Sequence, residues 1–163
     1  MKKIGSLGFT LIELLVVIGI LAILLAITLI AINPAKQFGN ANDTKRASDV
    51  NAILNAVNQY MADNKGIVPP GIPAAGGASP VEICEGTTCP GGASTTPGLC
   101  NALVATYIAQ LPTDPLSNLK GAGVPSTSCA AYDTGYEVQQ ATGGRITVTA
   151  PTTYSGTPIS VTR

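Results

Sequence analysis

Hydrophobic residues are concentrated in the first third of this chain. From Leu14 to Ile32 every side chain is apolar except Thr28 and the neutral Gly19. A helix of this length reaches across the hydrocarbon core of a bilayer. The pattern therefore predicts a transmembrane helix near the N-terminus.

A second helical pattern follows, with apolar residues on one face only. These apolar residues recur at steps of three and four, and polar residues fill the opposite face. They are Ala47, Val50, Ile53, Leu54, Val57, Tyr60 and Met61. Asn64-Lys65-Gly66 and then Pro69-Pro70 are stop signals. We predict an amphipathic helix that packs on a small core.

The remaining residues predict a loop-rich segment followed by a short helix and strands. Residues 66–98 are rich in Gly, Pro, Ala, Ser and Thr, so most of them should be loop. A short helical pattern covers residues 99–111. Apolar and polar positions then alternate as in strands. The three predicted strands contain Tyr136, Val138 and Gln140, then Ile146 and Val148 after a turn at Thr142-Gly143-Gly144, and finally Ile159 and Val161.

Composition and charge exclude several functions. The 163 residues have a formal net charge of zero, and only 11% are charged. Such a chain has no basic footprint for nucleic acid. It also contains no His, so Ser/His/Asp triads, Cys/His pairs and His-based metal sites are absent from it. We therefore expect a protein that is not an enzyme.

Glu13 at the edge of the apolar run separates three interpretations of the N-terminus. A secretory signal peptide would have a shorter apolar core, and Asn33-Pro34-Ala35-Lys36 offers no clear cleavage site. A plain signal anchor explains the length but gives Glu13 no role, although a carboxylate in a membrane segment requires a partner. In both, Lys2 and Lys3 keep the N-terminal end cytoplasmic.

The third interpretation supplies that partner. The segment Gly8-Phe9-Thr10-Leu11-Ile12-Glu13, followed by the apolar run, resembles the signature of type IV prepilins. The resemblance implies that a membrane-embedded peptidase cuts between Gly8 and Phe9 and that Phe9 is N-methylated. It also implies that Glu13 pairs with the terminal amine of a neighbouring subunit. Leu7 departs from the family pattern, because a small, polar or charged residue is more usual there.

This resemblance also implies a domain organisation and an α+β fold. Residues 1–8 would be a leader peptide and residues 9–64 one long helix, of which 9–32 form the membrane and filament part and 33–64 the amphipathic part. Residues 65–163 would form a head with a small antiparallel sheet and disulfide-bonded loops. Pro34 follows an N-cap at Asn33 or kinks the helix, and the resemblance favours a continuous helix.

The four cysteines, Cys84, Cys89, Cys100 and Cys129, are even in number and lie in a loop-rich region that is expected to be exported. Such a set favours disulfides. Of the three possible pairings we favour Cys84–Cys89 with Cys100–Cys129, because each bridge then closes a separate loop. The other two pairings remain open.

We expect no resident metal ion or cofactor. The cysteine spacings do not form the paired knuckles of zinc sites. Asp114 and Asp133 lie in expected loops, and some major pseudopilins that this chain resembles bind calcium in the comparable loop. A calcium site at these two residues is therefore a minor interpretation, and solvated turn residues are the main one.

The function implied by the resemblance is that of a major or abundant structural subunit of a type IV pilus. Its partners would be other copies of itself, the prepilin peptidase and an assembly platform in the membrane. It would be a single-pass membrane protein with its head outside the cytoplasm, and part of a surface pilus after assembly. One alternative is the major pseudopilin of a type II secretion or competence system. Segment Leu111–Pro115 also resembles the Leu-Pro-x-Asp-Pro region of these pseudopilins. The second is a membrane-tethered binding domain that never polymerises.

Overall fold

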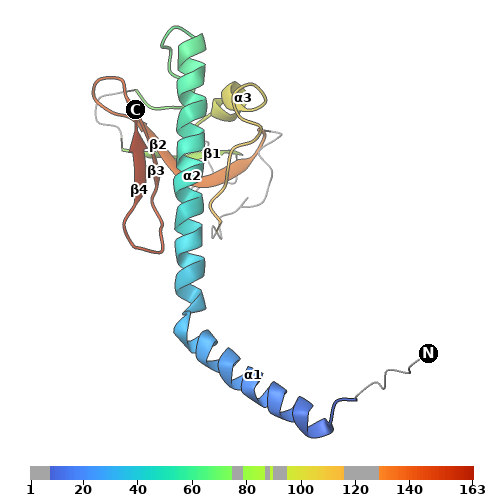
Figure 1. Cartoon of the computed structure of the whole chain (residues 1–163). Helices are drawn as coiled ribbons and strands as arrows, with labels where there is room; N and C mark the ends of the chain where they lie inside the picture. Colours follow the sequence, from blue (N-terminus) through green and yellow to red (C-terminus); the bar gives the residue numbers. More distant parts are fainter. Residues whose placement is uncertain (1–7, 75–78, 87–88, 90–94, 116–128) are drawn as a thin grey trace, which may run out of the picture. The chain divides into compact units, whose positions relative to one another are not determined.

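The computed structural model describes residues 8–74, 79–86, 89, 95–115 and 129–163. The chain forms two compact units, residues 1–38 and residues 39–163, and each is described by itself (Figure 1). Residues 1–7, most of the predicted leader, lie outside the described residues.

The first unit contains helix α1 (Leu11–Ala31) and the first residues of helix α2. The whole of α2 is Pro34–Asp63. Ile32 and Asn33 interrupt the helical backbone between α1 and α2. The Ile32 N–H still donates to the Thr28 carbonyl at 3.1 Å. Pro34 has no N–H to continue this ladder, and the Asn33 Oδ1 instead accepts a hydrogen bond from the Lys36 N–H at 3.3 Å. The expected continuous helix is therefore wrong, and Pro34 is the first residue of a new helix.

The second unit packs most of α2 on a four-stranded antiparallel sheet. Its strands are β1 (Val81–Glu85), β2 (Tyr132–Gln140), β3 (Ile146–Ala150) and β4 (Ile159–Thr162), and they lie in the order β1-β2-β3-β4. Figure 1 shows α2 running across one face of this sheet. One core lies between them, and it includes Val50, Ile53, Leu54 and Val57 of α2 and Tyr136, Val138, Ile146 and Val148 of the sheet.

The predicted α+β class and the three predicted strands of the tail are confirmed. The arrangement is consistent with the type IV pilin fold that the resemblance implies. Two local features differ from expectation. Strand β1 was not predicted, because residues 66–98 were expected to be mostly loop. Helix α3 covers only Leu99–Leu103, because Val104 is extended and Ala105 has a φ of 72°.

Candidate functional site

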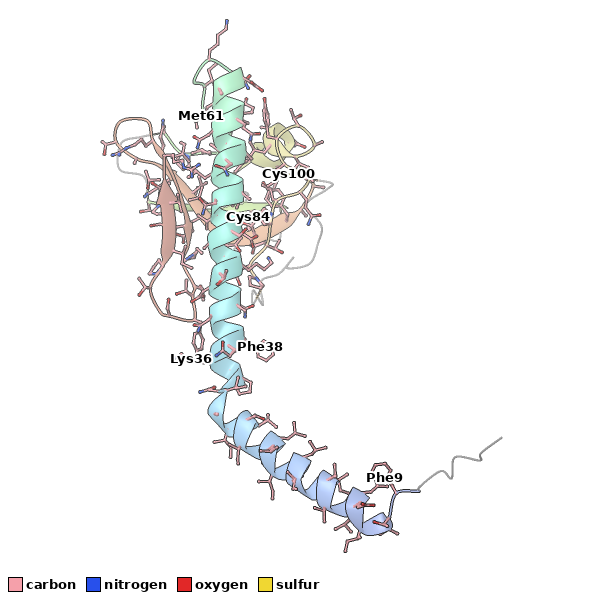
Figure 2. All side chains as sticks on the ribbon, viewed as in Figure 1. Phe9, Lys36, Phe38, Met61, Cys84 and Cys100 are labelled. Atoms are coloured by element: carbon pink, nitrogen blue, oxygen red, sulfur yellow. A yellow bond between two sulfur atoms is a disulfide. The ribbon has the colours of Figure 1, made fainter. Side chains whose placement is uncertain are left out.

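The Gly8–Phe9 peptide bond lies just outside helix α1, in a segment without regular structure. The side chain of Phe9 is 80% exposed. At Gly8 a Cβ atom would have no neighbouring atom within 4 Å. Figure 2 shows Phe9 at the N-terminal end of α1, with the side chains of that helix projecting on all sides. A protease would therefore find this bond accessible and not held in a helix.

Thr10 and Glu13 form a capping box at the start of α1. The backbone N–H and the hydroxyl of Thr10 each donate to the Glu13 Oε2 at 2.8 Å. In return the Glu13 N–H donates to the Thr10 Oγ1 at 3.3 Å. Such a box satisfies N–H groups that have no partner within the helix. The single chain thus supplies Glu13 with hydrogen-bond donors before any partner subunit does.

Thr10 has a role that was not predicted from the sequence, namely that of the N-cap of α1. Thr10-Leu11-Ile12-Glu13 has the S/T-x-x-E spacing of a capping box directly ahead of an apolar run. That spacing was the signal that could have identified it.

Helix α1 has no buried residue, and Glu13 is its only charged side chain. By length and composition it is the one helix of the described residues that is suited to cross a membrane. A continuous apolar surface of this kind requires lipid or other protein around it. Glu13 is the only group on it that could bind an opposite charge.

Arg46 links helix α2 to two other segments of the second unit. Its side chain is 1% exposed and contacts the Asp114 carboxylate through Nε at 2.6 Å and Nη2 at 2.9 Å. The Nη1 atom donates to the Asp43 Oδ1 at 2.8 Å. The hydrogen bonds that Arg46 donates to Asp114 raise the pKa of Arg46 above its usual value. Asp114 is therefore part of a buried ion pair and not a solvated turn residue.

Asp43 connects this ion pair to the loop between β3 and β4. Its carboxylate accepts hydrogen bonds from the N–H groups of Tyr154 at 2.9 Å and Ser155 at 3.1 Å. The bond from Tyr154 lowers the pKa of Asp43. The role of this cluster is structural, because all its charged groups pair with one another or with the backbone.

Asp133 differs from its expected setting. It lies within strand β2 instead of a loop and is only 1% exposed. Its neighbour is the carboxyl group of Glu82 on β1. No group of three or more His, Cys, Asp or Glu in the described part of the chain is arranged to hold a metal ion. Asp114 and Asp133 thus have separate partners, and both expectations of solvated turn residues are wrong.

The structure joins Cys84 to Cys89 and Cys100 to Cys129. These are the pairs that were favoured from the sequence. The first bridge ties β1 to residue 89, and the second ties α3 to the segment before β2. Figure 2 labels Cys84 and Cys100, one from each bridge. The two bridges therefore connect β1 and α3 to Cys89 and Cys129, which lie outside the helices and strands.

A protein-family model matches the N-terminal part of the chain. Residues 5–29 match the family model described as the prokaryotic N-terminal methylation motif. The matched segment contains the Gly8–Phe9 bond, the Thr10–Glu13 capping box and most of α1. No significant match is found among curated proteins or among solved structures. The recognition made from Gly8 to Glu13 is confirmed by the family match.

Proposed function

We propose that this chain, which carries the N-terminal signature of type IV pilins and pseudopilins, is a structural subunit of a type IV pilus. It enters the membrane as a prepilin, is cleaved after Gly8, is methylated on Phe9 and polymerises through α1. The observation that carries this proposal is the methylation motif at residues 5–29 on a fully exposed apolar helix.

The geometry around Gly8 supports the processing step. The bond to be cut precedes the first residue of α1 and is exposed. Cleavage there removes the leader and leaves the whole membrane helix on the product. The new amine then lies on Phe9, four residues before Glu13.

The assembly step follows from the cost of burying charge. When copies of α1 pack together, the amine of Phe9 and the carboxylate of Glu13 leave water and lipid headgroups. Each buried charge without a partner costs several kcal/mol, and removing one member of a buried pair costs about 3–5 kcal/mol. Pairing Glu13 of one subunit with the amine of the next removes this cost. It also sets the axial register, which apolar packing alone leaves undefined.

Mass spectrometry of the mature protein tests the proposal directly. We expect a chain that begins at Phe9 and carries one methyl group on its amine. A Gly8→Leu variant, matched in every other residue, should retain the leader, because the residue after which the peptidase cuts is changed. A wild-type chain that retains Met1, or that is cut near Ala35, would contradict the proposal.

The pseudopilin of a type II secretion or competence system is the second candidate. It is favoured by the segment Leu111-Pro112-Thr113-Asp114-Pro115, which resembles the equivalent region of major pseudopilins. Electron microscopy of cells with and without the gene separates the two. Long surface filaments that disappear on deletion support the pilus. Loss of protein secretion or DNA uptake from cells that never show such filaments supports the pseudopilus.

A further inference from the structure

Three carboxyl groups meet where β1 pairs with β2. Glu82 on β1 lies directly opposite Glu137 on β2. Like charges in directly opposed positions destabilise a sheet. Asp133 lies further along β2, and its carboxyl group is within hydrogen-bond reach of Glu82. An ordinary strand pair would avoid this arrangement.

An irregularity in the strand pairing accompanies the contact. The register between β1 and β2 shifts between Glu82 and Cys84, so that Cys84 is opposite Asp133. Gly135 has a φ of 72° at this point, which favours glycine. The Gly135 N–H donates to the Asp133 Oδ1 at 3.1 Å. The fold therefore holds one oxygen of Asp133 in a fixed position.

The second oxygen of Asp133 has an unusual environment. Asp133 is 1% exposed, and within the described residues its Oδ2 has no hydrogen-bond donor. A buried acceptor without a donor is costly. The adjacent Glu82 can supply the donor only if its carboxyl group carries a proton.

The charged groups around this pair favour that proton. The pKa of Glu82 is raised to about 7. Burial is the largest cause, followed by the charge and hydrogen bond of Asp133 and then by the charge of Glu137. Burial also raises the pKa of Asp133. Glu85 is a further acid on β1, and Glu137 faces Thr149 on β3. Among the described residues no Lys or Arg contributes to either pKa.

We propose that Glu82 and Asp133 form a proton-bridged carboxyl pair that fastens the edge strand β1 to β2 and releases it when the proton leaves. The strand is sensitive to this loss because, among the described strands, it is at the edge of the sheet and pairs only with β2. On its other side, the Glu82 and Cys84 carbonyls accept hydrogen bonds from Thr95 and Thr96. This pH-sensitive device is independent of cleavage and filament assembly, so that either idea can fail without the other.

The direction of the pH dependence follows from linkage. In the folded chain Glu82 holds its proton up to about pH 7, compared with an ordinary value of 4.5. Between these values the folded state binds more protons than the unfolded state, so stability falls as the pH rises. The stabilisation of β1 by this proton is therefore complete below about pH 4.5 and is lost as the pH rises through about 7.

Hydrogen exchange on the full chain in detergent micelles tests this proposal. The quantity to compare is the protection factor of the β1 amides, which corrects for the faster intrinsic exchange at high pH. In a calcium chelator we expect protection to fall about tenfold or more between pH 5.5 and pH 8, since each unit of pKa shift corresponds to a factor of ten. Amides of β3 should keep a constant protection.

Three variants distinguish this device from general loosening. Glu82→Gln supplies a permanent donor to Asp133, so protection of β1 should become high and independent of pH. Glu137→Gln removes one repelling charge, so the transition should move to lower pH. Glu85→Gln is the matched control on the same strand, because the Glu85 side chain accepts a hydrogen bond from the Gly98 N–H, which Gln can also accept; the wild-type transition should remain.

Constant protection of β1 in the wild type, or an unchanged transition in Glu82→Gln, would overturn the proposal. If Glu82→Gln does not fold, Glu137→Gln decides, and a transition that fails to move to lower pH overturns it. Repeating the exchange measurement with added calcium shows whether a proton or a metal ion holds the two carboxyl groups together. Restoration of β1 protection at pH 8 by calcium would identify a cation site and overturn the proton device.

Discussion

At the scale of single residues, the effect of a charge depends on its burial. Arg46 is 1% exposed and pairs with Asp114, which is 8% exposed. Lys45 pairs with Asp49 at a similar distance of 2.8 Å, but its side chain is 50% exposed. Exposed pairs contribute about 0–1 kcal/mol, whereas breaking a buried pair costs about 3–5 kcal/mol. The two neighbouring basic residues should therefore differ strongly in their effect on stability.

Asp114→Asn tests this difference. We expect it to lower the free energy of unfolding by about 3 kcal/mol, because Arg46 stays buried and keeps Asp43 as its only acid partner. Lys45→Met is the matched control and should lower it by less than about 1 kcal/mol. Urea denaturation in mild detergent at pH 7 measures both. Equal stability losses in the two variants would contradict the argument.

Gly39 illustrates a second constraint at this scale. Gly39 is buried on α2, and a Cβ atom there would overlap the ring of Tyr154. The backbone N–H of Tyr154 is held by Asp43 at 2.9 Å, so the loop between β3 and β4 is fixed close to the helix. Helix propensity alone would favour Ala over Gly by about 1 kcal/mol. The contact with the ring reverses that preference.

A double-mutant cycle separates these two effects. Gly39→Ala should destabilise the chain when Tyr154 is present, because the ring must move. In a Tyr154→Ala background the same change should stabilise the chain by about 1 kcal/mol, since only helix propensity remains. Thermal denaturation of the four proteins gives the coupling. Additive effects, with no change of sign, would show that the ring does not require glycine.

At the scale of elements, local sequence patterns were sufficient to predict the long helices and the tail strands, through the length of the apolar run for α1 and through periodicity for the others. The apolar stripe from Ala47 to Met61 and the alternation around Val138 each cover enough residues to define a period. Strand β1 has five residues, Val81–Glu85, which is too few for a period to stand out in a Gly- and Pro-rich segment. Helix α3 ends early because Ala105 adopts a left-handed φ, and no local pattern indicates this for alanine.

In the candidate site, too, the residues of a local motif could be predicted from the sequence, whereas environments set by contacts distant in sequence could not. Gly8, Phe9 and Glu13 are local to one motif and could be identified from the sequence. Asp114 finds Arg46 at a separation of 68 residues. Asp133 is buried within β2, opposite Cys84 of a strand that is distant in sequence. Tertiary packing decides both environments, so the sequence led to the wrong expectation of solvated turns.

The disulfides make a prediction at the scale of elements, because they close loops of different size. Cys100–Cys129 spans 29 residues and Cys84–Cys89 spans 5. In the chain-entropy model the longer loop contributes about 1.5 kcal/mol more to stability. We expect the Cys100→Ser/Cys129→Ser protein to unfold at lower urea concentration than the Cys84→Ser/Cys89→Ser protein.

Peptide mapping without reductant accompanies this comparison. It should find Cys84 joined to Cys89 and Cys100 joined to Cys129 in the wild-type protein. A peptide that links Cys84 to Cys100 or Cys129 would contradict the pairing itself. A Cys84→Ser/Cys89→Ser protein that is the less stable of the two would contradict the loop-length argument.

At the scale of the whole molecule, the second unit has a core, whereas the described residues of the first unit have none. The second unit buries apolar residues of α2 and the sheet around one centre. Helix α1 buries nothing within the chain. In lipid, apolar side chains gain little from packing against one another, because lipid tails are equally apolar. Assembly in a defined register thus requires a directional interaction, and on α1 the only charged candidate is Glu13.

The substitution Glu13→Ala tests this requirement. Before assembly Glu13 is satisfied by Thr10 of its own chain, so the variant should still insert and be cleaved after Gly8. After assembly the amine of the neighbouring Phe9 would be buried without a counter-charge, a loss on the order of several kcal/mol at every interface. Repeated along a polymer, this loss should abolish filaments. We expect protein of mature length in the membrane fraction and no filaments in the sheared surface fraction.

Thr28→Ala is the matched control for that experiment. Thr28 is also a polar residue of α1, but its hydroxyl donates to the Leu25 carbonyl of the same helix at 2.9 Å and carries no charge. Its removal should leave filament yield close to that of the wild type. Normal filament yield from Glu13→Ala would remove the charge pair as the source of register. The chain would then be better explained as a membrane-tethered domain, because a tether needs the apolar helix and makes no use of Glu13.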